Sequence, residues 1–102
     1  MLQSTNEHKA QFRRTKKWKD FRKNLIKEQK FDPVTQSRLT KKANCHHLCL
    51  KDEEYEILSE TRQVMLNPTT HDMIHFLFRT KDWRKALEET KKILERMEEL
   101  NK

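Results

Sequence analysis

Apolar residues recur at helical spacing in the first third of the chain. Over residues 8–30 the pattern predicts one helix with a single apolar stripe, which consists of Trp18, Phe21, Leu25 and Ile26. Residues 1–7 are polar, and we expect them to fray. Proline disfavours helix in the residue before it, so Asp32-Pro33 ends the helix. Residues 31–42 are then predicted to form a loop with a short extended piece.

Two short apolar segments in the middle of the chain predict strands. The first covers residues 44–50 and the second residues 63–66, and polar positions bound both. The acidic segment 51–62 is predicted to connect them through a short turn of helix, with three side chains anchored in the core: Tyr55, Ile57 and Leu58.

Two more helices are predicted after the second strand. Asn67 is a good N-cap and Pro68 fits the first helical position, so a helix continues to Phe78. A cap or bend at residues 80–82 then precedes a long amphipathic stripe, which consists of Trp83, Ala86, Leu87, Thr90, Ile93, Leu94, Met97 and Leu100. Such a stripe favours core packing or the seam of a homodimer, and it does not indicate a ligand.

The composition limits the size of the core. The chain has 102 residues, of which 33% are hydrophobic and 38% charged, so it predicts one small domain over residues 1–102 with a thin core. A metal, a partner or bound nucleic acid could supply missing stability. The sequence contains no glycine, which argues against a glycine-rich phosphate loop or a dinucleotide-binding fold. No apolar run approaches the length of a membrane span, so no membrane partner is expected.

Positive charge is concentrated in the N-terminal part. Residues 1–42 carry 13 Lys and Arg against 4 Asp and Glu, a net +9, whereas residues 43–102 carry 10 against 12, a net −2. Such an excess favours nucleic acid as the partner over a merely solvated helix face. The candidate nucleic-acid-binding residues are Lys16, Lys17, Lys19, Arg22 and Lys23, with Trp18 expected to pack rather than to stack on a base.

Two features bear on the cellular compartment. The first ten residues are polar and lack the apolar region of a secretory signal. The only cysteines, Cys45 and Cys49, do not make a disulfide framework. We therefore expect a cytoplasmic protein.

Four of the five histidines fall in two tight pairs. His71 and His75 are four residues apart, so on a helix both imidazoles share one face and could chelate a metal with a third ligand. Alone, this spacing is more often an ordinary histidine pair, but the adjacent pair His46-His47 on a neighbouring strand favours a metal site. Neighbours on an ideal strand point to opposite faces, so His46 and His47 converge only if the strand bends or ends there.

The order of these elements resembles a known family. A strand with His-His, a loop, a second strand and a helix with His-x-x-x-His are similar to the ββα-metal (His-Me) finger of HNH endonucleases. The separations, 25 residues from His46 to His71 and 4 to His75, are close to those of the DNase colicins. Over residues 43–78 the strings C-H-H-L and L-N-P-T-T-H-D-M-I-H-F-L resemble small bacteriophage HNH proteins.

The resemblance implies an α+β fold and a nuclease. The ββα core at 43–78 would be flanked by the basic helix 8–30 and a C-terminal helix at 80–101. One divalent ion (Mg²⁺, Mn²⁺, Ni²⁺ or Zn²⁺) would be held by His46, His71 and His75, and His47 would be the general base for cutting or nicking DNA. A phage-encoded protein would work in the host bacterial cytoplasm, with phage or host proteins as further partners.

One position departs from the family. HNH enzymes usually carry, fifteen residues after the base, an Asn that orients it, and here that position is Arg62. Arginine donates hydrogen bonds but cannot accept them, although it could clamp a phosphate oxygen in catalysis. The departure favours an alternative: a catalytically weak or inactive HNH-like module that binds nucleic acid or a host protein. The two CxxC pairs of many family members are also absent from the sequence.

A rival interpretation uses the sulfur atoms. Cys45, Cys49, His71 and His75 have the ligand types of a structural zinc module, in which four protein ligands close the site. Their spacer of 21 residues is much longer than the roughly 12 residues of compact DNA-binding fingers. Otherwise the two cysteines are small buried hydrophobic residues.

Overall fold

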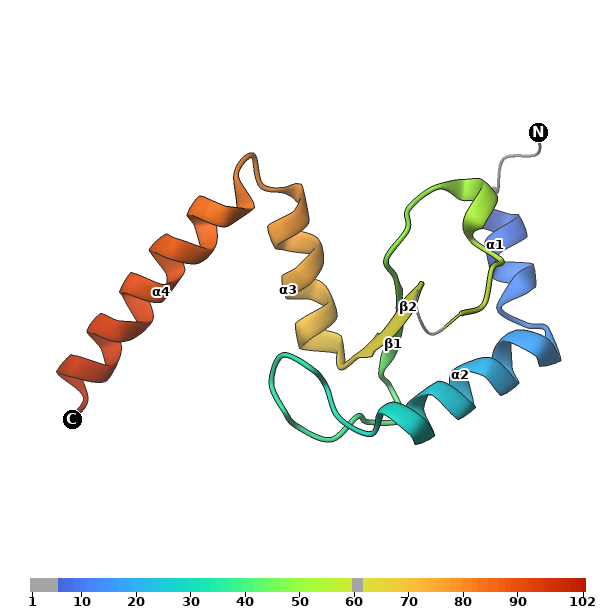
Figure 1. The fold of residues 1–102 in the computed structure, drawn as a ribbon, viewed down its shortest axis with the longest axis horizontal. Helices are drawn as coiled ribbons and strands as arrows, with labels where there is room; N and C mark the ends of the chain where they lie inside the picture. The colour runs from blue at the N-terminus through green and yellow to red at the C-terminus, as the bar shows by residue number, and fades with distance from the viewer. Residues whose placement is uncertain (1–5, 60–61) are drawn as a thin grey trace. The chain divides into compact units, whose positions relative to one another are not determined.

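The structure is a computed structural model that describes residues 6–59 and 62–102. It is of the α+β class, as predicted, and its elements in chain order are α1 (Asn6–Phe12), α2 (Lys16–Gln29), β1 (Asn44–His47), a 3₁₀ turn (Asp52–Glu54), β2 (Gln63–Leu66), α3 (Pro68–Arg79) and α4 (Trp83–Leu100) (Figure 1). The described residues up to His71 form one compact unit, and Asp72–Lys102 form a second.

The prediction of a single helix over residues 8–30 is wrong, because the chain bends after Phe12 (Figure 1). Thr15 has an extended backbone (φ −71°, ψ 151°), and its side chain accepts a hydrogen bond from the Trp18 amide at 3.2 Å. The same hydroxyl donates to the Phe12 carbonyl at 2.7 Å. One threonine therefore both ends α1 and caps α2. Of the residues expected to fray, Asn6 and Glu7 are helical, and residues 1–5 lie outside the described part.

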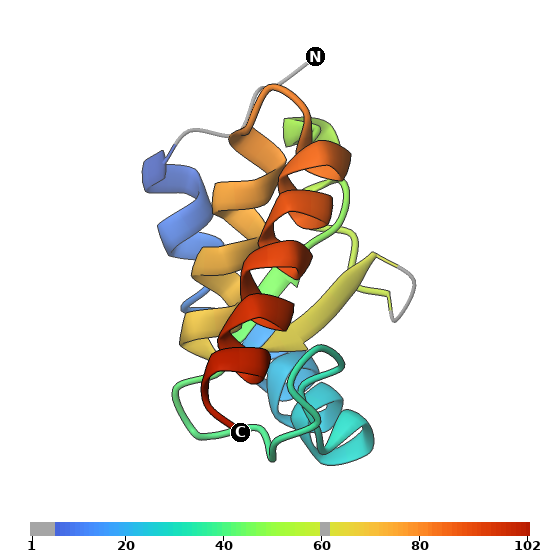
Figure 2. The same cartoon turned by 90° about the vertical axis from the view of Figure 1, so that its left-hand side faces the viewer.

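Strands β1 and β2 form an antiparallel hairpin in which Cys45 lies opposite Met65 and His46 opposite Val64 (Figure 2). The predicted strand at residues 63–66 and the predicted helical turn between the strands are confirmed by β2 and the 3₁₀ turn. Strand β1 is shorter than the predicted 44–50. The Leu48 amide still donates to the Arg62 carbonyl at 2.8 Å, but the Arg62 amide turns back to the Ser59 carbonyl at 3.0 Å. The Arg62 amide therefore does not bond back to Leu48, and the ladder ends at this pair.

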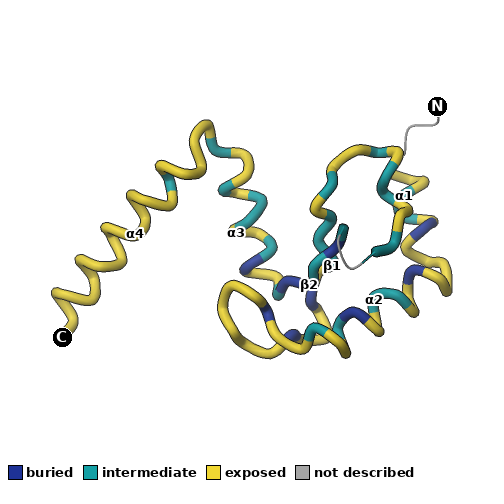
Figure 3. The backbone as a smooth tube through the Cα atoms, viewed as in Figure 1, coloured by how far each residue is buried: buried dark blue, intermediate teal, exposed yellow. Residues whose placement is uncertain are grey.

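The core lies where α2 packs on the hairpin. The predicted stripe is confirmed: Trp18 and Leu25 are buried, and Phe21 and Ile26 pack beside the buried cluster, which consists of Leu25, Leu39, Ala43 and Met65 (Figure 3). Of the anchors predicted between the strands, Ile57 is 43% exposed, so that assignment is wrong.

A side-chain amide joins α2 to the open edge of β2. Gln29 donates from Nε2 to the Met65 carbonyl at 2.7 Å and accepts at Oε1 from the Met65 amide at 2.9 Å. A buried edge strand needs partners for its unpaired backbone groups. The Gln29 amide supplies them, as a third strand would.

A buried carboxylate fixes the start of α3. Asp32 accepts from the amides of Val34 (2.8 Å) and Thr35 (3.1 Å) through Oδ1, and from the amide of Asn67 (3.0 Å) through Oδ2. The Thr70 side chain also bonds to it. A negative charge is stabilised at a helix N-terminus, so Asp32 both closes its own loop and anchors the first turn of α3.

Asn67 directly precedes α3, as predicted, and its carbonyl accepts from the His71 amide at 2.9 Å. Its side chain also bonds to the preceding loop: Oδ1 accepts from the Thr40 amide at 2.9 Å, and Nδ2 donates to the Arg38 carbonyl at 3.0 Å. Asn67 therefore joins the start of α3 to the loop before β1.

The second unit contains the end of α3 and all of α4. Asp82 caps α4, as predicted, by accepting from the Lys85 amide at 3.1 Å. No residue of α4 is buried (Figure 3). The apolar stripe is largely exposed: Ile93 is 62% and Leu100 67% exposed. No helix in the described ranges has the length and apolar character needed to cross a membrane.

Replacing Asp32 tests its anchoring role. Burial raises the pKa of Asp32, but the bonds from Thr35, Asn67, Thr70 and Val34 outweigh it and lower the pKa below its usual value. The carboxylate therefore stabilises the fold above about pH 4, the ordinary pKa, and this contribution is lost as pH falls through the lower folded pKa. We expect Asp32→Asn to reduce the free energy of unfolding at pH 7 by about 1–3 kcal/mol, because an amide offers one acceptor fewer.

Urea denaturation followed by circular dichroism measures this difference. The difference in free energy of unfolding between Asp32→Asn and wild type should become smaller when the pH is lowered to 3. The matched control is Asp20→Asn, an exposed carboxylate on α2, which should change stability by less than about 0.5 kcal/mol. Equal stability of Asp32→Asn and wild type at pH 7 would contradict the anchoring role.

Candidate metal centre

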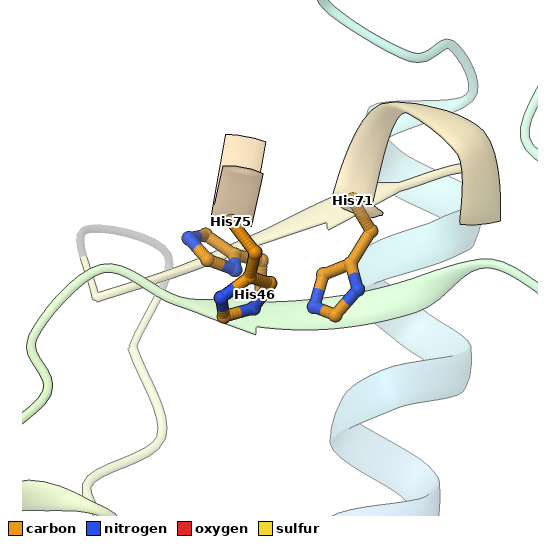
Figure 4. A group of neighbouring side chains, drawn as sticks. All are labelled: His46, His71 and His75. Carbon is orange, nitrogen blue, oxygen red and sulfur yellow. The ribbon is translucent and has the colours of Figure 1, made fainter. Parts of the chain in front are cut away.

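Three histidines from two elements converge. His46 lies on β1, and His71 and His75 lie on successive turns of α3 (Figure 4). One ligand nitrogen from each lies within 4.8 Å of the other two, and all three side chains are half-buried. The rings of His46 and His71 meet edge to face, with centroids 5.3 Å apart. The structure thus brings together the three residues predicted as metal ligands.

Local structure accounts for this convergence. The His71 amide donates to the Asn67 carbonyl at 2.9 Å, so α-helical hydrogen bonding starts in the turn that Asp32 anchors. His75 follows one helical turn later on the same face. The register that places His46 opposite Val64 fixes the third imidazole, because a slip of one residue would turn it to the other side of the hairpin.

The donor set fits a transition-metal ion. Imidazole nitrogens bound to one tetrahedral ion lie roughly 3.4 Å apart, as follows from metal–nitrogen bonds of about 2.0–2.1 Å. The three donors lie within 4.8 Å of one another, so a small approach of the side chains would complete such a site, and neutral imidazoles suit Zn²⁺, Ni²⁺, Cu²⁺ or Fe²⁺. Three protein ligands leave a coordination position open, which is typical of catalytic rather than structural zinc sites.

The sulfur atoms of Cys45 and Cys49 are not part of the histidine cluster. The metal-binding group found among the described residues contains neither cysteine. The Cys49 thiol donates to the Glu54 carboxylate. Burial raises the pKa of Cys45 to about 11 despite the opposing charge of Arg22. Because metals bind the thiolate, these surroundings favour the three-histidine set over a set with two cysteines.

The fourth paired histidine is not in the donor group. His47 follows His46 on β1, and its ring stacks on Trp18 (centroids 5.7 Å apart, planes 9° apart) and on Tyr55 (4.4 Å, 12°). The four imidazoles therefore do not gather around one ion. The strand does not bend enough to overcome the alternation of its side chains.

The two nitrogens of His47 have different surroundings. Nε2 is buried without a hydrogen-bond partner among the described residues, and the ring bonds to the Tyr55 backbone carbonyl, which leaves Nδ1 as the donor. Burial lowers the pKa of His47, the Tyr55 carbonyl opposes this effect, and the charges of Lys9 and Arg13 lower the pKa further. At neutral pH the imidazole is uncharged, and its Nε2 lone pair can accept a proton.

A cationic pocket of about 490 Å³ lies beside His47. Arg13, Arg22 and Lys42 line it, and none of the described lining residues is acidic. His71 also lines this pocket, so the pocket and the histidine cluster share a residue. An anion in the pocket would therefore meet three positive charges close to the metal ligands.

The predicted nucleic-acid-binding residues are only partly in this pocket. Arg22 lines it and donates to the carbonyls of Lys41 (3.1 Å) and Ala43 (2.6 Å). The other four, Lys16, Lys17, Lys19 and Lys23, are exposed on α2, where Lys16 lies 4.0 Å from Asp20. Arg13 and Lys42, which line the pocket, were not among the residues predicted to bind nucleic acid. Both belong to the basic N-terminal block, but only the fold shows that they meet at His47.

Arg62 is not among the residues that line the pocket. Its guanidinium pairs with the Glu54 carboxylate at 2.9 Å. Hydrogen bonds from Cys49 and Arg62 lower the pKa of Glu54, so this carboxylate is ionised at neutral pH. The side chain at the position of the family's Asn is thus engaged in the segment that connects the strands.

Comparison of the chain with family models, with curated proteins and with solved structures finds no match. The function must therefore be inferred from the residues of this chain and their arrangement.

Metal affinities of single-residue variants distinguish the three-histidine site from the site with two cysteines and two histidines. We expect His46→Ala, His71→Ala and His75→Ala each to weaken binding of Zn²⁺ or Ni²⁺ by more than about 100-fold, since loss of a mere outer-shell partner already costs about 10–100-fold. Isothermal titration calorimetry on chelator-treated protein measures this change. Cys45→Ser and Cys49→Ser should bind like wild type.

The fifth histidine provides the matched control. His8 lies on α1 and pairs with Glu56 at 3.0 Å, outside the cluster, so His8→Ala should keep wild-type affinity. Retained binding in His46→Ala together with lost binding in the cysteine variants would replace the three-histidine site by the four-ligand one.

Proposed function

We propose that this protein is a metal-dependent, HNH-type endonuclease that hydrolyses phosphodiester bonds of DNA. The main support is one arrangement: a histidine cluster able to hold a metal shares His71 with a cationic pocket that His47 also lines, and Nε2 of His47 is buried without a hydrogen-bond partner among the described residues. The order of strand, strand and helix, with His-His and His-x-x-x-His, is the further reason for placing the chain near HNH enzymes.

The histidines have separate roles in this proposal. His46, His71 and His75 would hold one divalent ion, which supplies positive charge at the scissile phosphate and at the departing oxygen. His47 acts from the pocket side: its neutral imidazole takes a proton from the attacking water at Nε2. The Tyr55 carbonyl holds the opposite nitrogen, so the accepting lone pair keeps its direction.

The cations of the pocket would hold the substrate. Arg13 and Arg22 present guanidinium groups, which can form paired hydrogen bonds with phosphate oxygens, and Lys42 adds a point charge. Beyond the pocket, the exposed lysines of α2 extend the positive surface along the backbone of a nucleic acid. Release of counterions from the DNA then supplies affinity without sequence preference.

The second candidate is a catalytically weak or inactive relative that binds nucleic acid or a host protein. Its support is Arg62, which stands where HNH enzymes carry an orienting Asn and is paired with Glu54. This candidate keeps the metal cluster and the cationic pocket but predicts no cleavage.

Plasmid nicking distinguishes the two candidates. We expect supercoiled DNA to be nicked or linearised with at least one of Mg²⁺, Mn²⁺, Ni²⁺ and Zn²⁺. Because a positioned base contributes about 10²–10⁴-fold, His47→Ala should lower the rate by that amount without losing metal affinity. His8→Ala is the control and should cleave like wild type. Absence of cleavage by wild type with all four metals would favour the binding module.

The salt dependence of DNA binding tests whether the cations of the pocket contact phosphate groups. Removal of one phosphate contact should lower the slope of log K against log salt concentration by about one and weaken DNA binding to all sequences alike. We expect this for Lys42→Gln in a fluorescence anisotropy titration. Lys27→Gln, an exposed lysine near the end of α2 outside the pocket, is the matched control. Equal slopes for Lys42→Gln and wild type would remove Lys42 from the proposed DNA contact.

A further inference from the structure

Two aromatic rings restrict the imidazole of His47. The rings of Trp18 and Tyr55 lie nearly parallel to it, with interplanar angles of 9° and 12°. The terminal torsion of a histidine otherwise has a broad, two-fold distribution. Rotation of the imidazole about this torsion would drive its edge into the stacked rings, so the stacking fixes the ring plane.

A hydrogen bond then selects one of the two orientations within that plane. The Tyr55 carbonyl accepts from the ring, and Nε2 is the atom without a partner. A flipped ring would lose this bond and exchange the positions of its two nitrogens. Tyr55 thus restricts His47 in two ways: its ring stacks on the imidazole, and its backbone carbonyl accepts a hydrogen bond from it.

Helix α1 holds Tyr55 in place. Arg13, directly after α1, donates from Nη1 to the Tyr55 hydroxyl at 2.7 Å, and the Lys9 ammonium lies 5.0 Å from the centre of the Tyr55 ring. Phe12 contacts Tyr55 edge to face at 5.9 Å and Trp18 at 5.8 Å. The bend at Thr15 brings these groups to the segment between the strands.

We propose that Trp18 and Tyr55 are positioning residues for His47, and that with α1 behind them they replace the orienting amide that residue 62 does not supply. This inference rests on the proposed function, because positioning has catalytic meaning only if His47 is the base. Trp18 and Tyr55 also line the pocket, and the role proposed for them here is to restrict the imidazole.

Steady-state cleavage by Tyr55→Leu and Tyr55→Phe provides the kinetic test. Leucine keeps the backbone carbonyl but removes the ring, so we expect kcat to fall about 10-fold, part of the contribution of a positioned base, with KM changed less than about two-fold. Phenylalanine keeps the ring, so Tyr55→Phe should retain kcat within about three-fold.

The matched control is Phe21→Leu. Phe21 is half-buried and its ring lies 6.4 Å from Trp18, so its loss loosens the same core without removing a ring from His47. It should leave kcat near the wild-type value. If Tyr55→Leu does not fold by circular dichroism, Trp18→Phe, which reduces the stacked area, takes its place with a smaller expected fall in kcat.

Nuclear magnetic resonance of the metal-free protein supplies a measurement independent of cleavage. The ring protons of His47, assigned by their loss in His47→Gln, should be shifted upfield by the stacked rings, and the nitrogen shifts should show the proton on Nδ1. Tyr55→Leu should remove much of the upfield shift, and Phe21→Leu should keep it.

The outcomes separate the two proposals. Unshifted His47 protons in wild type, or wild-type kcat in a folded Tyr55→Leu whose shift is lost, overturn the positioning role and leave the nuclease standing. Wild-type protein that cleaves with none of the metals overturns both. A fall in kcat without a change in KM, together with loss of the upfield shift, supports the positioning role.

Discussion

The alternation of side chains along one short strand organises the site. Neighbouring residues on β1 point to opposite faces of the hairpin, so His46 reaches α3 and His47 reaches α2 and the segment after β1. A single dipeptide therefore contributes to two environments, one rich in imidazole donors and one enclosed by aromatic rings. The register with β2 sets both at once, since a slip of one residue would exchange the two faces.

The rest of the first unit keeps this strand and the first turn of α3 in fixed relation. A two-stranded hairpin is marginal alone and needs packing against a helix. Here α2 supplies the apolar contact through Leu25 and closes the edge of β2 through Gln29. Asp32, in the loop after α2, anchors the start of α3, so the helix that carries His71 and the helix that supports the hairpin are joined by one buried carboxylate.

Much of this arrangement could be predicted from periodicity and spacing. The stripe of α2, strand β2, the cap of α4 and the convergence of His46 with His71 and His75 follow from local patterns and one family resemblance. The break at Thr15 was missed because the apolar and basic pattern continues across it, and a threonine at that position is an ordinary helix residue until its hydroxyl caps the next turn. The role of Asp32 depends on its contact with Asn67, 35 positions away, and that of Arg13 on its contact with Tyr55, 42 positions away. No local pattern records such contacts.

The energetics of the pocket also favour a ligand there. A buried nitrogen without a hydrogen bond costs about 1–3 kcal/mol, and three cations without a carboxylate among the described lining residues repel one another. Elsewhere the described residues satisfy their polar groups closely, as Gln29, Asp32 and Asn67 show. A chain with a thin core tolerates such a local cost only where it serves another purpose, because the whole fold is stable by a small margin. A bound anion would offset the repulsion among Arg13, Arg22 and Lys42, which links the charge of the pocket to the chemistry proposed for it.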